Sequence, residues 1–238
     1  MRSKEIINKV IFKTKIHGKD MAFKLGLKNK QKVIDEFHKL YYESGLLSGT
    51  WKNTYFMGVP AQKCPLDLFI YQEILYDVKP DLIIETGTAG GGGALFLASI
   101  CDLLGKGEVI TIDISDNRVG LDHPRVTFLL GSSTSPEVLK KIEKAVKKAK
   151  KVMVVLDSDH SKKHVLNELK LYSKLVTPGS YLIVEDTNVN GNPVNPYHGD
   201  GPNEALNEFL ITNKKFVWDK DREKFLFSFN PGGYLKRL

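Results

Sequence analysis

From Asp81 onward the chain alternates short apolar segments with longer amphipathic ones, and this alternation limits the folds available to it. Strands are predicted at residues 81–85, 108–114, 126–131, 151–159 and 180–186. Helices are predicted between them at 92–105, 135–149 and 160–176, with Ser135 as an N-cap. Strands that alternate with helices form right-handed βαβ crossovers, so a mostly parallel α/β sheet is expected, with helices on both faces.

Both ends of the chain depart from this alternation. Residues 215–229 contain two apolar-rich stretches around a charged turn, which predicts an antiparallel hairpin at one sheet edge. Two helices, at 30–45 and 65–79, are predicted ahead of the first strand. We therefore expect a basic helical N-terminal extension over residues 1–50 and a single domain over residues 51–238.

The charge of the chain is concentrated at its start. The formal net charge is +7, and residues 1–32 hold ten Lys and Arg against two acids, which leaves the remainder near neutral. A basic arm suits nucleic acid or an anionic membrane, but a solvated helix face is the commoner explanation.

Composition places the chain among ordinary globular proteins. No apolar run approaches the ~18 residues of a membrane span, and the N-terminus lacks a secretory apolar region. Cys64 and Cys101 show no metal-binding spacing, so a cytoplasmic location is expected.

Glycines crowd the loop after the first predicted strand, between Gly87 and Gly93. The dinucleotide signature GxGxxG fails, because Ala89 or Phe96 occupies a glycine position in the two registers available. The spacing Glu85, Gly87, Gly91 instead resembles the first motif of class I S-adenosylmethionine-dependent methyltransferases.

A second acid, Asp113, ends the next strand, where its carboxylate suits a ribose diol. Thr88, Ser133 and Asp157 complete the predicted cofactor-binding set with Glu85, Gly87, Gly91 and Asp113. The competing explanation is a tight turn that only allows close helix packing.

Four more acids follow two further strands: Asp157 and Asp159, then Glu185 and Asp186. Carboxylates gathered at one sheet edge repel one another unless a cation or protons compensate, and oxygen ligands suit Mg²⁺, Mn²⁺ or Ca²⁺. Solvated turn acids are the alternative.

The arrangement resembles divalent-metal-dependent O-methyltransferases, in which one acid after the fourth strand joins two adjacent residues after the fifth. Asp159 is preferred over Asp157 beside Glu185 and Asp186, because Lys162 then stands where those enzymes carry a catalytic lysine. Lys162 or His160 is predicted to take the proton, and His164 is expected to lie on ordinary helix surface.

Three long segments closely resemble the cephalosporin hydroxylase family, which includes rhamnosyl O-methyltransferases. They run from Gly58 to Gly105, from Val155 to Gly191 and from Glu223 to Arg237, and the resemblance as a whole begins near Trp51. The resemblance implies a Rossmann-like class I methyltransferase fold, a site for S-adenosylmethionine and a Mg²⁺ site. It says little about the acceptor.

Two loops are predicted to shape the site. Residues 187–202 form a long polar connection beside Asp186, which is typical of a lid, and residues 51–63 are expected to close over the cofactor. The alternatives are a surface excursion for the first loop and a core-covering segment for the second.

The predicted activity is S-adenosylmethionine-dependent, divalent-metal-dependent O-methylation of a hydroxyl on a small molecule such as a sugar or glycoside. Its rivals are an NAD-type oxidoreductase and a non-catalytic accessory protein that binds S-adenosylmethionine. Nucleic-acid methylation is disfavoured, because the base-methylating motif is missing after the fourth strand. Assembly of the chain into a homo-oligomer is left open.

Overall fold

The computed structural model describes residues 29–47 and 49–238 in two units, Met1–Phe37 and His38–Leu238. The basic arm at residues 1–28 therefore lies outside the described residues. In the first unit the described part is the beginning of helix α2 (Lys30–Leu47), where Gln31 Nε2 donates to Asp35 Oδ1 at 2.8 Å. Helix α2 corresponds to the helix predicted at residues 30–45.

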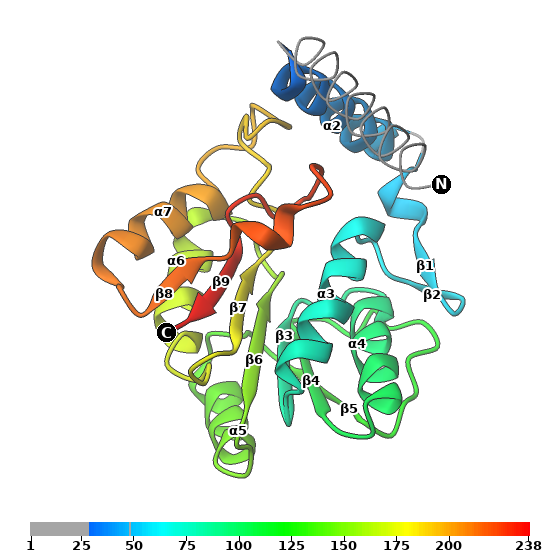
Figure 1. Ribbon diagram of the computed structural model, residues 1–238. Coiled ribbons are helices and arrows are strands. Elements are labelled where there is room, and N and C mark those ends of the chain that lie inside the picture. The colour runs from blue at the N-terminus through cyan, green and yellow to red at the C-terminus, as the bar shows by residue number, and fades with distance from the viewer. Residues whose placement is uncertain (1–28, 48) are drawn as a thin grey trace, which may run out of the picture. The chain divides into compact units, whose positions relative to one another are not determined.

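The second unit is built on a seven-stranded sheet with the order β5-β4-β3-β6-β7-β9-β8 (Figure 1). Its strands are β3 (Leu82–Thr86), β4 (Glu108–Asp113), β5 (Val126–Leu130), β6 (Val152–Leu156), β7 (Tyr181–Val184), β8 (Phe216–Trp218) and β9 (Tyr234–Arg237). The first five are parallel, whereas β9 pairs antiparallel with both β7 and β8. This topology confirms the predicted fold class.

Helices cover both faces of the sheet, as strands buried on both sides require. On one face, α3 (Pro65–Val78) and α4 (Gly92–Leu103) pack against Ile83, Met153 and Val155. On the other face, α5 (Pro136–Val146), α6 (Lys162–Tyr172) and α7 (Pro202–Thr212) pack against residues such as Ile84 and Val154. The period-two alternation of strand side chains divides the core in this way.

Local sequence signals explain several helix ends. Ser135 Oγ accepts a hydrogen bond from the Val138 amide at 3.3 Å, so the predicted N-cap of α5 is confirmed. Helix α7 begins at Pro202, and Glu204 Oε2 accepts from the Gly201 amide at 2.7 Å. Helix α7 was not predicted, although a proline at N1 followed by a glutamate is a helix-start signal.

The antiparallel edge hairpin is confirmed, but its second strand was predicted wrongly. Residues 224–229 do not pair; the short helix η2 (Lys220–Glu223) follows β8, and β9 begins only at Tyr234. Phe227 and Phe229 instead enter a cluster with Tyr42, Cys64 and other buried apolar residues.

Buried Asp67 fixes the same segment, because it accepts from Ser228 Oγ at 2.7 Å and from the Phe229 amide at 2.8 Å. Tyr234 Oη is a third donor at 2.7 Å. Burial raises the pKa of Asp67 to about 6, against the opposing effect of these donors.

The remaining elements lie ahead of α3: the short helix η1 (Trp51–Asn53) and the two-residue strands β1 (Tyr55–Phe56) and β2 (Val59–Pro60), which pair antiparallel. Within the described part of the chain, no helix is both long and apolar enough to cross a membrane.

Candidate active site

A pocket of about 610 Å³ runs along the carboxyl ends of the parallel strands. One part of its wall comes from residues that follow β3, β4 and β5, including Thr88, Ile114 and Ser133. Another part comes from residues that follow β6 and β7, such as His160 and Asp186. Open α/β sheets bind their ligands in this position.

The glycine loop holds its shape through a close approach to β6. Gly87 has φ +88°, and a Cβ built there would lie 1.8 Å from the Asp157 carbonyl oxygen. The Thr88 and Ala89 amides both donate to Asp113 Oδ2 at 3.0 Å. Asp113 therefore fixes the loop as well as lining the pocket.

Replacing Gly87 with alanine is expected to disrupt the loop, because the new methyl group meets backbone and a positive φ disfavours alanine. We expect loss of S-adenosylhomocysteine binding and a free energy of unfolding lower by about 2 kcal/mol or more. Calorimetric titration and urea denaturation measure the two effects. Gly105→Ala is the matched control, since φ is +70° there but a Cβ meets nothing within 4 Å; an equal loss of cofactor binding in both variants would contradict the prediction.

Among the other predicted cofactor residues, Glu85 is buried and accepts from Thr111 Oγ1 at 2.7 Å. Burial raises the pKa of Glu85 to about 7 despite the nearby Lys63 ammonium. Ser133 is also buried on the pocket wall. Gly91 was predicted to bind the cofactor, but it does not line the pocket. Its amide donates to the Thr88 carbonyl at 2.8 Å, and it is the N-cap residue of α4, with φ +96°.

His164 also differs from its predicted place on ordinary helix surface. It lines the pocket, and its Nε2 lies 3.2 Å from Ser133 Oγ and 3.3 Å from Glu168 Oε1. The hydrogen bond with Glu168 raises the pKa of His164. The i,i+4 spacing of His164 and Glu168 on α6 is a signal that could have identified this pair, although it does not indicate that Glu168 is fully buried.

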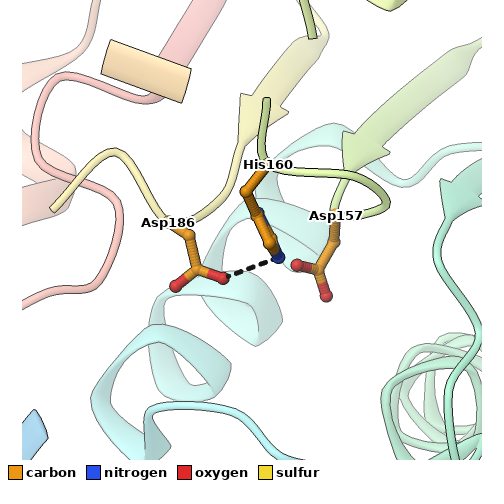
Figure 2. Close-up of side chains that lie close together, drawn as sticks. All are labelled: Asp157, His160 and Asp186. Carbon is orange, nitrogen blue, oxygen red and sulfur yellow. Dashed lines mark ion pairs between the residues drawn. The ribbon is translucent and has the colours of Figure 1, made fainter. Parts of the chain in front are cut away.

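Three ligand-type side chains converge between β6 and β7, as Figure 2 shows. One ligand atom from each of Asp157, His160 and Asp186 lies within 4.8 Å of the others. His160 Nε2 is 3.4 Å from Asp186 Oδ2. Burial alone would lower the pKa of His160, but the charges of Asp186 and Asp157 outweigh it and raise that pKa.

Asp159, the preferred metal ligand from the sequence, does not join this group. It is exposed, and its Oδ1 accepts from the Ser161 amide at 2.7 Å, just ahead of α6. This hydrogen bond lowers the pKa of Asp159. The geometry therefore favours Asp157 over Asp159 beside Asp186.

Glu185 is linked to Asp157 through the ammonium group of Lys63, which contacts both carboxylates. Lys63 Nζ donates to Asp157 Oδ2 and, at 2.5 Å, to Glu185 Oε1. Tyr71 Oη also donates to Glu185 Oε1, at 2.7 Å. Burial raises the pKa of Asp157, Glu185 and Asp186, and repulsion among them adds to this effect.

Sequence reasoning missed Lys63 as a site residue. Its segment was expected to close over the cofactor, but a lysine in a loop carries no signal that its amine will be buried beside carboxylates 94 and 122 residues away. Only the fold brings these groups together.

Lys162, predicted as a catalytic residue, lies outside the pocket wall. Its Nζ pairs with Glu208 Oε2 at 3.3 Å and with Asp200 Oδ2 at 3.5 Å. The Glu208 hydrogen bond raises the pKa of Lys162, which favours the protonated form over a base. Of the predicted pair, only His160 lines the pocket.

The wall beyond Asp186 is largely aromatic. Tyr42, Trp51 and Phe229 line it with Val189 and His198. Burial and the Asp186 charge raise the pKa of the Tyr42 phenol to about 12.

The loop predicted as a lid contributes to this wall only in part. Val189 and Val194 are buried in the cluster that contains Phe229, and His198 reaches the pocket, whereas Tyr197 is 96% exposed. Residues 187–189 and Val194 are therefore packed into the domain.

The residues present fit a divalent cation and a positively charged cofactor. Half-buried Asp157 and Asp186 converge with His160, and the Lys63 ammonium already occupies a position between Asp157 and buried Glu185, as a stand-in for a metal ion. Oxygen donors of this kind suit Mg²⁺. Glu85 and Asp113 add acceptors on the side of the glycine loop.

Comparison with known proteins identifies the family of the chain. The family described as rhamnosyl O-methyltransferase/CmcI matches residues 48–238. A rhamnosyl O-methyltransferase of Mycobacterium leprae (strain TN) is 37% identical over 214 residues, covering 86% of this chain and 90% of that protein. One from Mycobacterium bovis (strain BCG / Pasteur 1173P2) is 38% identical over 212 residues, covering 86% and 85%.

Among solved structures, the Mg-SAM form of CmcI superposes with a TM-score of 0.61 at 19% identity, over 79% of this chain and 77% of that chain. Identity at this level supports the fold alone. The family resemblance predicted from the sequence is confirmed by the family match and the mycobacterial relatives.

Proposed function

The chain belongs to the rhamnosyl O-methyltransferase/CmcI family and is an S-adenosylmethionine-dependent O-methyltransferase, and we propose that its acceptor is a hydroxyl group of a sugar or glycoside. The sugar assignment is supported by the name that the mycobacterial relatives carry. The single observation that carries the mechanism is the convergence of Asp157, His160 and Asp186 inside the pocket.

We propose Asp157, Glu185 and Asp186 as the residues that hold a Mg²⁺ ion. All three follow β6 or β7 directly, and the pKa of each carboxyl responds to the charge of at least one other. When bound, the ion would stabilise an ionised acceptor hydroxyl, and S-adenosylmethionine would supply an electrophilic methyl group. Asp157 takes the place that the sequence analysis gave to Asp159.

The cofactor would lie along the glycine loop. Gly87 and Thr88 give a close backbone approach, and Asp113 and Glu85 offer carboxylates at the ends of two neighbouring strands. Ser133 completes this side from the end of β5. Asp157 follows β6, the strand between the two groups, so cofactor and acceptor would meet beside it.

His160 would take the proton from the acceptor hydroxyl at its Nε2 atom. An imidazole is suited to this role near neutral pH, and cation binding at Asp157 and Asp186 would offset the carboxylates that raise its pKa. Tyr42 and Phe229 shield the same corner of the pocket from water.

The rivals raised from the sequence have less support. An NAD-type oxidoreductase would need the dinucleotide signature, which this chain lacks. A non-catalytic accessory role would not explain why Asp157 and Asp186 converge with His160. A cytoplasmic location stays a prediction, consistent with free, buried Cys64 and Cys101. Homo-oligomerisation and the absence of nucleic-acid binding also stay predictions.

Titration of S-adenosylhomocysteine tests the cofactor site. We expect wild-type binding to weaken about 10–100-fold in Asp113→Ala, because a charged acceptor and the anchor of the loop are lost together. Asp116→Ala is the matched control: Asp116 lies three residues away, pairs with Arg118 and does not line the pocket. Equal affinity in both variants would contradict the assignment of Asp113.

Methyl transfer to a panel of rhamnosides and other glycosides, with Mg²⁺ or with a chelator, tests the acceptor class. Binding of S-adenosylhomocysteine without turnover on any glycoside would remove the sugar proposal and retain the cofactor site.

A further inference from the structure

Lys63 is held deep in the pocket by its surroundings. The residue is only 5% exposed, and its amide donates to Thr54 Oγ1 at 3.0 Å. Its stem is enclosed near α4, since a Cβ at Gly93 would lie 3.2 Å from the Lys63 Cε atom. The ammonium therefore has a defined position rather than a range of exposed ones.

That position lies between carboxylates assigned to the metal. Lys63 Nζ donates to Asp157 Oδ2 and to Glu185 Oε1, while Tyr71 Oη adds a neutral donor to Glu185. The Lys63 charge also acts on Glu85 and on Asp186. One buried cation thus acts on four carboxylates, of which Glu85 and Glu185 are buried and Asp157 and Asp186 are half-buried.

Burying carboxylates without compensating charge is costly, so an acidic site that must exist without its ion requires an internal cation. Lys63 meets this requirement. When a divalent ion enters, however, the same ammonium lies a few ångströms from it and repels it, and it must give up Asp157 for the ion to bind there.

We propose that Lys63 is the internal counter-cation of the metal site, which holds Asp157 and Glu185 in place without the ion and competes with the ion for Asp157. The proposal rests on the metal site described under Proposed function. It makes Lys63 a positioning residue that sets the affinity for the ion. A residue with a purely structural role would act in the opposite direction, since its loss would disorder the ligands and weaken ion binding.

The test compares Mg²⁺ binding by wild type, Lys63→Met and Lys63→Arg, using calorimetric titration of the chelator-treated full chain with Mg²⁺ alone. Removing one positive charge beside a divalent ion is expected to tighten Mg²⁺ binding at least about tenfold in Lys63→Met. Lys63→Arg keeps the charge and is expected to stay within about threefold of wild type. Unchanged or weaker binding in Lys63→Met would overturn the proposal.

Thermal unfolding gives a second readout. In chelator, Lys63→Met is expected to melt below wild type, and Mg²⁺ is expected to raise its melting temperature more than that of wild type. A Lys63→Met chain that folds only with Mg²⁺ supports the proposal. Equal Mg²⁺-induced shifts in the two proteins count against it.

A measurement on the wild type decides the case if Lys63→Met does not fold at all. Acylation of the Lys63 amine by an activated ester, followed by peptide mass spectrometry, is expected to increase when Mg²⁺ is added, because displaced Lys63 loses its partner Asp157. No increase in a protein that binds Mg²⁺ overturns the proposal. A wild type that binds S-adenosylhomocysteine but no Mg²⁺ refutes the metal site itself, and the two failures are therefore distinguishable.

Discussion

Asp157→Asn is expected to lower methyl transfer by at least about 10³-fold, whereas Asp159→Asn should leave it within about twofold of wild type. Half-buried Asp157 pairs with the Lys63 ammonium and lies beside His160 and Asp186, so its charge acts where the acceptor hydroxyl would ionise. Several kcal/mol of charge stabilisation depend on such a ligand, and each 1.36 kcal/mol is tenfold in rate. Turnover at saturating Mg²⁺ and cofactor measures the effect.

The two substitutions form a matched pair, because they make the same change two residues apart on one turn. Asp159 is exposed and bonded to the Ser161 amide. S-adenosylhomocysteine affinity should stay within a few-fold of wild type in both variants, which shows that the pocket is intact. If Asp159→Asn were the inactive variant, the ligand assignment made from the sequence would be reinstated.

Asp157 and Asp159 illustrate which parts of the site could be predicted from the sequence and which could not. Acids after two buried strands were correctly expected at one edge of the sheet, because parallel strands end on the same side. Which acid joins His160 and Asp186 depends on the path of the turn after β6. Both acids line the pocket, but the Asp157 amide still bonds to the Thr86 carbonyl at 2.9 Å, whereas Asp159 Oδ1 accepts from the Ser161 amide ahead of α6 and lies outside the group formed with His160 and Asp186.

Most of the sheet was predictable for a related reason. Its central strands are buried on both faces, so their sequences are short apolar runs that differ clearly from amphipathic helices. The C-terminal edge was harder, because Phe225 to Phe229 and Tyr234 to Arg237 are both apolar enough to pair with β8. Buried Asp67 selects between them by binding Ser228 and the Phe229 amide, a contact across 161 residues.

Residues recruited from distant segments could not be predicted. Lys63 and Tyr42 precede the first strand of the large sheet, yet both line the pocket. Lys162 was misplaced because its position rested on spacing from Asp159 alone. Lys162 forms salt bridges with Glu208 on α7 and with Asp200 in the loop before it, and these hold it outside the pocket. Helix α7 was not predicted from the sequence.

The proton acceptor gives the second large effect. His160→Gln is expected to lower kcat about 10²–10⁴-fold, the range typical of a lost general base, with the acceptor KM within a few-fold of wild type. Glutamine keeps a polar side chain of similar reach but cannot accept the proton near neutral pH. Lys162→Gln is the control, and it should leave kcat within about twofold, because the Lys162 amine pairs with Glu208 and Asp200.

Calorimetric titration of Mg²⁺ separates this role from the other one that the geometry allows. His160 lies within the ligand-type group formed with Asp157 and Asp186, so it is also placed to contact an ion directly. A base acting through its Nε2 atom predicts that Mg²⁺ affinity in His160→Gln stays within a few-fold of wild type. A metal ligand predicts that the same substitution weakens Mg²⁺ binding by tenfold or more. The second result would make His160 a metal ligand, and another group would then have to accept the proton of the acceptor hydroxyl. Lys63 is not suited to that role, because it is already protonated and paired with Asp157 and Glu185.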